Sequence, residues 1–206
     1  MSETYIQVIK ADEAGYDAAL RGLAHNKKQP PAAMAKVAQK LAELDGGHNK
    51  FLESIYVWLD VRAPRYWWQE ADTFRLSTKQ SESTMHTLTE ELLSIDIHSD
   101  ASVDAFIREN FEPDACPRQT LRTIFEAAQK KDFLSIKKHL PEGFLQTRMW
   151  CMNYKTLRNI ILQRRTHRLP QWKEFIRQTL ALVDHPELLP GLVRKTEKTT
   201  VDAYPL

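Results

Sequence analysis

The chain has 206 residues, of which 42% are hydrophobic and 27% are charged, so it can bury one sizeable core. Its 29 lysines and arginines nearly balance its 27 aspartates and glutamates, giving a formal net charge of +2. Such an even balance is not typical of a protein held on nucleic acid by bulk electrostatics. No Gly/Ser-rich run or fixed-period repeat divides the sequence, so we expect one domain over residues 1–206.

Targeting segments and metal-ligand spacings are not found in the sequence. Its first residues are polar with early acids, and no apolar run approaches the roughly 20 residues of a membrane span. The seven histidines lack the i, i+4 spacing of a metal site. Cys116 and Cys151 lie in unlike surroundings, which suggests neither a CxxC site nor a disulfide. We expect a cytoplasmic protein with no membrane contact and no bound metal.

The first half of the chain predicts one helix and two strands. Residues 31–44 place apolar side chains at helical spacing and stop at Asp45-Gly46-Gly47, a signal for a helix C-terminus. Residues 51–61 alternate apolar and polar side chains, which is typical of a strand. Ala63-Pro64 should end this strand because proline lacks the N–H that a ladder needs. A second strand is expected at residues 5–9.

Helical patterns dominate the remainder of the chain. Residues 77–84 are rich in hydroxyl side chains, which compete with regular structure for backbone hydrogen bonds, so we expect a loop or a polar helix entry there. Helices are predicted at residues 85–93, 102–110, 119–131, 149–165 and 171–183, with a turn at 141–143. The segment after residue 190 is expected to be a peripheral strand or extension. The predicted fold class is α+β, helix-rich with a small antiparallel or mixed sheet.

The helix expected to run to Arg165 carries an arginine on its apolar face. At 100° per residue, Arg164 shares a face with Asn153, Leu157, Ile160 and Ile161. An inward arginine must find an anion or hydrogen-bond acceptors, because its five donors cannot be neutralised. The alternative is that Arg164 snorkels at the helix end and meets a structural carboxylate.

Further basic residues surround this helix in the sequence. They are Arg148, Lys155, Arg158, Arg165, Arg168 and Arg177, and Glu174 is the only acidic residue between positions 148 and 177. This concentration of positive charge would suit phosphate groups. A solvated basic face is the alternative interpretation.

Residues 47–83 resemble the signature region of the flavin-dependent thymidylate synthases (ThyX). In that family G-H-x-x-x-F-E-H opens a strand, an A-P dipeptide ends it, and R-H-R-x7-S follows. This chain has Gly47-His48, then VRAP at 61–64, then Thr73-Phe74-Arg75, seven residues and Ser83. The spacing of the motif is kept although several of its residues differ.

A second block also resembles the family, which there reads L-P, then W-x-x-N-x-R-S-L-x-N-F-L-x-L-R and finally A-Q-W. This chain has Leu140-Pro141, then WCMNYKTLRNIILQR from Trp150 to Arg164, and then Pro170-Gln171-Trp172. Two ordered blocks at compatible separation favour a ThyX-like fold. They comprise a signature region at 47–86 and nucleotide and flavin helices at 149–183.

The resemblance implies an enzyme that transfers a one-carbon unit to C5 of a pyrimidine deoxynucleotide. It would convert dUMP to dTMP, or to a hydroxymethyl product, with methylenetetrahydrofolate as carbon donor and NADPH-reduced FAD as hydride source. The family forms homotetramers with flavin sites between subunits. By position, the resemblance assigns Arg75 and Ser83 to catalysis; His48, Arg75, Asn153, Lys155 and Asn159 to the cofactor; and Ser83, Arg148 and Arg164 to the substrate. A gapless alignment places Thr147, rather than Arg148, at a nucleotide-binding arginine.

Several signature residues differ from the family. Thr73 and Phe74 replace the first two letters of R-H-R, Ser81 replaces a glutamate and Met85 an arginine. These differences leave open a non-catalytic descendant that binds a nucleotide or a partner protein. A generic α+β module that contacts nucleic acid through its basic region is a further alternative. Read residue by residue, Trp67, Trp68 and Phe74 would be core aromatics, Ser83 a helix N-cap and Asn159 a surface residue.

Overall fold

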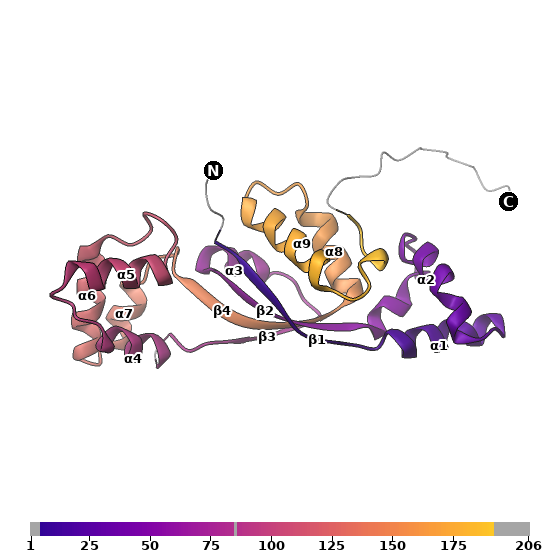
Figure 1. The fold of residues 1–206 in the computed structure, drawn as a ribbon, viewed down its shortest axis with the longest axis horizontal. Coiled ribbons are helices and arrows are strands. Elements are labelled where there is room, and N and C mark those ends of the chain that lie inside the picture. The colour runs from indigo at the N-terminus through magenta and orange to yellow at the C-terminus, as the bar shows by residue number, and fades with distance from the viewer. Residues whose placement is uncertain (1–4, 85, 192–206) are drawn as a thin grey trace.

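A four-stranded antiparallel sheet forms the centre of the molecule. The computed structural model describes residues 5–84 and 86–191, and its strands are β1 (Gln7–Ala14), β2 (Tyr56–Pro64), β3 (Ser77–Ser81) and β4 (Leu145–Asn153). Their order in the sheet is β1-β2-β4-β3, and every neighbouring pair is antiparallel. The predicted α+β class with a small antiparallel sheet is confirmed. Figure 1 shows the sheet in the middle of an elongated molecule, with helices at both ends.

One face of the sheet, here called the covered face, packs against helices α3 (Arg65–Ala71), α8 (Tyr154–Arg164) and α9 (Pro170–Leu182) (Figure 1). The alternation along β2 decides which side chains point there, since Val57, Leu59 and Val61 are fully buried while Tyr56 is 41% exposed. Between the sheet and these helices lies an aromatic core of Trp67, Trp68, Trp150, Trp172 and Phe175, all fully buried. The core interpretation of Trp67 and Trp68, and of the nearly buried Phe74, is confirmed.

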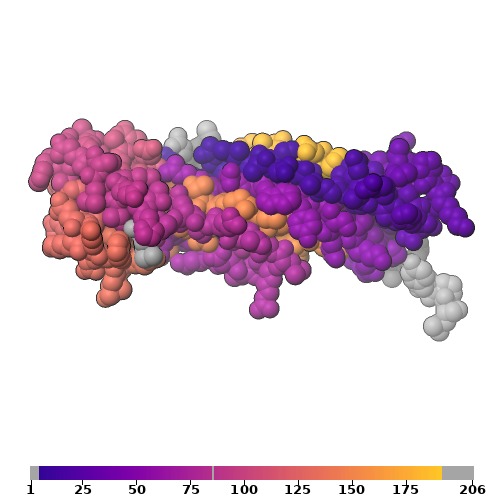
Figure 2. Space-filling view, turned by 90° about the horizontal axis from the view of Figure 1, so that it is seen from below, coloured from indigo at the N-terminus to yellow at the C-terminus, as the bar shows by residue number. Residues whose placement is uncertain are grey.

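The opposite face of the sheet, here called the open face, is visible between the two helical ends of the molecule (Figure 2). Ile9 and Tyr56 lie on this face and are 53% and 41% exposed. Ile9 pairs with Asp60, which has the same strand parity as Tyr56, and directly paired residues share a face. Helices α3, α8 and α9 therefore cover one face of the sheet, whereas the opposite face exposes apolar side chains such as Ile9 and Tyr56.

Each end of the sheet carries its own helices. At one end are α1 (Tyr16–Lys27), α2 (Ala35–Ala42) and the 3₁₀ turns η1 (Pro31–Met34), η2 (Lys50–Ser54) and η3 (Pro186–Leu188). At the other are α4 (Thr87–Ser94), α5 (Asp100–Asn110), α6 (Arg118–Gln129) and α7 (Phe133–His139), which follow β3 and precede β4. This second group, the α4–α7 unit, has a separate core that includes Leu88, Val103, Leu121 and Phe144.

The prediction of one helix over residues 149–165 is wrong in its first part. Residues up to Asn153 belong to β4, and α8 begins at Tyr154. Trp150 and Met152 are fully buried, whereas Met149 and Cys151, which alternate with them, are partly exposed. This short apolar run fits a strand as well as a helix. Pairing with β2 and β3 on both sides makes it a strand.

The prediction of a loop or helix entry over residues 77–84 is also corrected. Ser77–Ser81 forms β3, which pairs with β4 and, within the described residues, is an edge strand of the sheet. Its hydroxyl side chains are tolerated because a strand at the edge can remain partly solvated. The strand expected at 51–61 begins at Tyr56, after the η2 turn, and ends at Pro64 as predicted.

Most other predictions of secondary structure are confirmed within one to three residues. They cover the helical stretch at 31–44, α4, α5, α6 and α9, whereas the strand expected at 5–9 is found as β1 at Gln7–Ala14 and ends five residues later than predicted. Helices α1, α3 and α7 were not predicted, and the expected C-terminal extension lies outside the described residues apart from its first positions. None of the helices in the described part of the chain is long and apolar enough to span a membrane.

Candidate functional site

The residues predicted to contact the cofactor gather around the first half of α8. Asn153 caps this helix, with its side-chain oxygen accepting a hydrogen bond from Thr156 N at 2.9 Å. The Lys155 ammonium donates to Asn49 Oδ1, which places His48, the exposed neighbour of Asn49, beside the same turn. Asn49 is fully buried, and its Nδ2 has no hydrogen-bond partner within the described residues.

Arg75 joins this group through the turn between α3 and β3. The Arg75 side chain is exposed, and the next residue, Leu76, has φ 60° and is 83% exposed. Thr156 Oγ1 donates to Leu76 O at 3.4 Å, so the turn lies against the start of α8. Asn159 is exposed one helical turn beyond Lys155. The structure therefore brings all five predicted cofactor residues to one region, here called the α8 group.

The donor chemistry of the α8 group fits a flavin nucleotide. Arg75 and Lys155 supply two cations, which suit an anion. The buried Asn49 amide holds a donor without a partner among the described residues, and such a group is costly unless something accepts from it. Asn159 and Asn153 already use their side-chain oxygens, the first to accept from Gln163 Nε2 at 3.0 Å and the second to cap α8.

Arg164 lies on the inward face of α8, as predicted, and has a carboxylate partner. Its Nη1 is 3.4 Å from Glu70 Oε2, and its guanidinium lies over the rings of Phe74 and Trp172 at 5.2 and 5.0 Å. Glu70 also accepts a hydrogen bond from Trp172 Nε1 at 2.8 Å. The Nε of Arg164 has no partner among the described residues. The alternative that Arg164 meets a structural carboxylate therefore has a partner in the structure, Glu70 of α3. The residues four positions before and after Arg164 are not acidic.

Ser83 lies in a cavity of about 510 Å³ where the sheet meets the α4–α7 unit. The cavity is lined by hydroxyl side chains, acids and apolar groups, among them Arg62, Glu82, Glu91, Thr147, Phe106 and Phe144. Ser83 Oγ accepts a hydrogen bond from His86 N at 3.3 Å, and Ser83 O accepts from Thr87 N at 3.0 Å. These bonds resemble the N-cap alternative for Ser83, although the helix itself begins at Thr87. We call this cavity the Ser83 pocket.

The Ser83 pocket is more acidic than basic. Burial raises the pKa of Glu82, with a smaller contribution from Glu91, while a hydrogen bond from Thr147 N and the charge of Arg62 lower it. The Thr147 N to Glu82 Oε1 distance is 2.9 Å. Arg62 donates to Glu109 O at 2.7 Å and to Asn110 Oδ1 at 3.2 Å. The pocket therefore suits a neutral, hydrogen-bonding part of a ligand better than a doubly charged phosphate.

Arg148, the other predicted substrate residue of this region, lies on the opposite side of the sheet from Ser83. Thr147 pairs with Arg62 and lines the Ser83 pocket. Its neighbour Arg148 points to the covered face, because successive side chains of a strand alternate. The Arg148 guanidinium lies over the Trp68 ring at 4.7 Å. Within one chain, Ser83 and Arg148 do not share a site.

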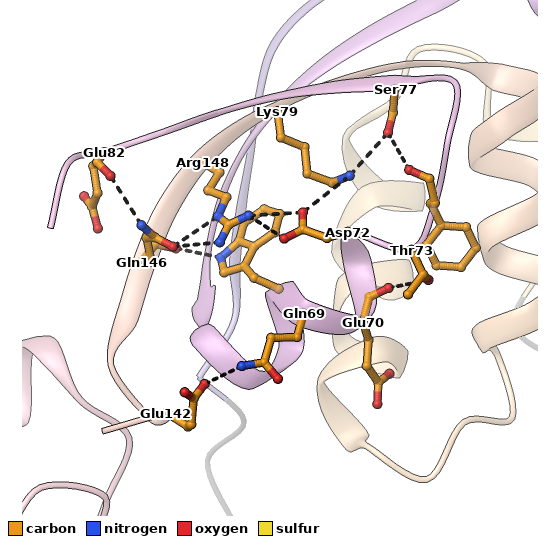
Figure 3. Close-up of polar contacts among 12 residues, drawn as sticks. Gln69, Glu70, Asp72, Thr73, Ser77, Lys79, Glu82, Glu142, Gln146 and Arg148 are labelled. Atoms are coloured by element: carbon orange, nitrogen blue, oxygen red, sulfur yellow. Dashed lines mark hydrogen bonds and ion pairs between the residues drawn. The ribbon is translucent and has the colours of Figure 1, made fainter. Parts of the chain in front are cut away.

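Around Arg148 the structure assembles a polar cluster at the edge of the covered face (Figure 3). Arg148 binds both oxygens of Asp72 through Nη1 at 3.1 and 3.0 Å, and Gln146 Oε1 through Nε and Nη2 at 3.1 and 2.9 Å. Lys79, from β3, has its ammonium 3.7 Å from Asp72 Oδ1 and 4.8 Å from the centre of the Trp150 ring. We call Lys79, Arg148 and Asp72 the Asp72 cluster.

Sequence reasoning missed Lys79, Glu70 and Asp72. The sequence predicts a loop around Lys79, yet Lys79 lies two residues from both Ser77 and Ser81, which is the period-two spacing of a strand. Glu70 and Asp72 lie next to the replaced R-H-R triplet, and their pairing with Arg164 and Arg148 joins segments far apart in the chain. No local pattern could have shown that pairing.

Most arginines of the basic stretch have acidic partners. Arg148 pairs with Asp72, Arg158 with Asp45, Arg164 with Glu70 and Arg177 with Glu174. Three of these acids come from residues 45–72, so the excess of positive charge in the linear sequence is largely cancelled in space. This weighs against the alternative of a basic surface for nucleic acid.

The Ser83 pocket and the α8 group lie toward opposite ends of β4. Glu82 N donates to Thr147 O near the start of the strand, whereas Asn153 is its last residue. Asn153 lies six positions after Thr147 in the chain, and a strand rises about 3.3 Å per residue. The two regions are therefore roughly 20 Å apart along the strand.

Solved structures with the same fold include flavin-dependent thymidylate synthases. One is ThyX from Helicobacter pylori complexed with FAD and dUMP, with a TM-score of 0.76 and 16% identity, covering 89% of this chain and 97% of that chain. A second structure of that protein with FAD and dUMP has a TM-score of 0.70 and 15% identity, covering 90% and 97%. The UMP/dUMP methylase PolB from Streptomyces cacaoi, bound with 5-Br UMP, has a TM-score of 0.57 and 14% identity, covering 90% and 93%.

No protein-family model and no curated protein sequence matches the chain. The structural matches nevertheless extend over about nine-tenths of it. The chain is an α+β protein with the ThyX fold, and the resemblance drawn from the two sequence blocks is confirmed at the level of the fold.

Proposed function

We propose that the chain is a divergent flavin-dependent enzyme that transfers a one-carbon unit to C5 of a pyrimidine deoxynucleotide. The observation that carries this proposal is the position of Ser83, the signature serine, in a 510 Å³ cavity of a fold shared with dUMP-bound proteins. A cavity of this volume is in the range of small-molecule sites. Methylation and hydroxymethylation of dUMP are both within the proposal, and the PolB match makes UMP a further substrate to test.

In this proposal the base and sugar occupy the Ser83 pocket. Ser83 and Thr147 offer hydroxyl groups, and Phe106 and Phe144 offer apolar contact area. Burial raises the pKa of Glu82, and its carboxyl group can form a hydrogen bond with the base. Ser83 acts as a hydrogen-bonding group and not as a nucleophile.

The α8 group is the proposed flavin site. FAD reduced by NADPH would supply the hydride there, and methylenetetrahydrofolate would supply the carbon. The charge of Arg75 would favour the anionic form of the reduced ring, and Lys155 would contact a phosphate or ring oxygen. His48, Asn153 and Asn159 would complete the contacts. Phe74, which replaces the histidine of R-H-R, is nearly buried and offers this site no polar donor.

We further propose that the complete site forms between chains of a homo-oligomer, as the family resemblance implies, with a homotetramer as the expected state. Two observations support shared sites. The Ser83 pocket and the α8 group are separated by roughly 20 Å along β4, and the open face exposes Ile9 and Tyr56. The single domain over residues 1–206 and the cytoplasmic location remain predictions.

The test is an anaerobic reaction of the purified protein with FAD, NADPH, methylenetetrahydrofolate and either dUMP or UMP, with products identified by mass spectrometry. We expect a methylated or hydroxymethylated nucleotide from the native protein and a strongly reduced yield from Ser83→Ala. Ser81→Ala is the matched control, because Ser81 is an exposed serine two residues before Ser83, at the end of β3. Nucleotide binding without any product would favour the non-catalytic descendant instead.

A further inference from the structure

The Asp72 cluster holds two cations and one carboxylate, and we propose that it is a binding site for a phosphate-type oxyanion. It lies on the covered face and is therefore distinct from the Ser83 pocket. The proposal requires neither the substrate nor the cofactor of the proposed function. Lys79 and Arg148 would bind the anion, and Asp72 would give way to it.

Arg148 is fixed in the orientation that such a site needs. Gln146 Oε1 accepts from both Nε and Nη2, which holds one edge of the guanidinium. The flat side of the group lies 4.7 Å from the centre of the Trp68 ring, and Trp68 is fully buried. The remaining Nη1 points toward Asp72 (Figure 3). A guanidinium held in place loses little conformational entropy when it binds an anion.

Lys79 is a cation whose charge is incompletely compensated. Its side chain is only 11% exposed, and its ammonium, which has three donors, lies 3.4 Å from Ser77 Oγ and 3.7 Å from Asp72 Oδ1. Burial lowers the pKa of Lys79; Asp72 opposes this effect and the charge of Arg148 adds to it. A second negative charge at this position would therefore stabilise the ammonium.

Asp72 is the member of the cluster best placed to move. Its side chain is 50% exposed, against 17% for Arg148 and 11% for Lys79. It lies just past the end of α3, where its backbone N–H, not its carboxylate, bonds to the helix. The carboxylate thus occupies the solvent side of both cations. A phosphate group has more oxygens than a carboxylate and can contact Lys79 and Arg148 together.

The proposal is tested by calorimetric titration with inorganic phosphate, dUMP and FAD in separate experiments. Asp72→Asn should tighten phosphate binding about tenfold, because it removes the competing carboxylate. Lys79→Met should weaken binding by about tenfold or more, and Lys79→Arg should largely retain it. The dUMP and FAD titrations show whether the phosphate group comes from a nucleotide or from the free ion.

Asp184→Asn is the matched control. Asp184 is 58% exposed and forms an ion pair with Lys10 at 2.5 Å. Unlike Asp72, which pairs with both Lys79 and Arg148, it pairs with one lysine. Its removal should leave phosphate affinity unchanged. Thermal melting of every variant shows whether it is folded. If Lys79→Met does not fold, Lys79→Arg and Asp72→Asn still test the proposal.

The inference is wrong if the native protein and Asp72→Asn both fail to bind phosphate, or if Asp184→Asn has the same effect as Asp72→Asn. This outcome is separable from failure of the proposed function. Nucleotide turnover with no phosphate site would overturn only the inference. Phosphate binding at the cluster with no dUMP or FAD binding would overturn only the proposed function.

Discussion

Thr147 and Arg148 are adjacent in β4, yet they belong to two regions with opposite chemistry. Thr147 contributes to the Ser83 pocket, where glutamates outnumber the one lining arginine. Arg148 contributes to the Asp72 cluster, where two cations share one acid. A strand places neighbouring side chains on opposite faces, so a shift of one residue in an alignment moves a charge from one region to the other. The face of the sheet on which a side chain lies, rather than its position in the sequence, decides which residues can act together.

The largest expected difference between the faces concerns stability. Trp150→Ala removes a fully buried ring that contacts Trp67, Trp68 and Phe175, and should lower the free energy of unfolding by about 3–5 kcal/mol. Met149→Ala, on the open face, should cost about 1 kcal/mol. Urea unfolding measures both. Equal losses would show that the open face is packed as tightly as the covered face.

A second prediction concerns Arg164, whose ion pair belongs to the covered face. Arg164→Ala removes contacts with Glu70, Phe74 and Trp172 and should lower the free energy of unfolding by about 1–3 kcal/mol. The exposed Arg168 serves as control, and Arg168→Ala should change it by about 0.5 kcal/mol or less. If Arg164→Ala instead leaves stability unchanged and abolishes nucleotide binding, the role implied by the family resemblance is correct.

A third prediction concerns the Ser83 pocket. Ser83→Ala should weaken dUMP binding about tenfold, the effect of losing one hydrogen bond to a ligand. It should leave phosphate binding at the Asp72 cluster unchanged, since the two regions lie on opposite faces. Equilibrium binding with both ligands makes the comparison. A parallel loss of both affinities would mean that the two regions are one site.

The smallest expected effect is a pH dependence from Glu82. Burial raises its pKa above the ordinary 4.5, so the folded protein holds this proton more tightly than the unfolded chain does. The stability that this proton provides is present below pH 4.5 and is lost as the pH rises through the raised pKa. Glu82→Gln should therefore gain stability relative to the native protein at neutral pH and not at pH 4. An equal difference at both pH values would contradict a raised pKa.

The sequence predicted the helices well where one face is apolar and the other polar, as in α6 and α9. It failed at residues 149–153, because the four apolar residues from Met149 to Met152 have no distinctive period and only their pairing with two strands defines them. The five residues that it assigns to a cofactor lie together near the start of α8, since the spacing of the two blocks reflects the fold, and their role in binding stays a prediction. It could not place Lys79 or Glu70, whose partners come from distant segments.

Titration of the purified protein with FAD, followed by flavin absorbance with and without dUMP, tests the central claim most directly. We expect saturable FAD binding that tightens when dUMP is present, because both ligands would meet at one shared site. Lys155→Met should weaken FAD binding, whereas Lys36→Met, on the exposed side of α2 (Ala35–Ala42), should not. The absence of saturable FAD binding under either condition would contradict the account and leave only a shared scaffold.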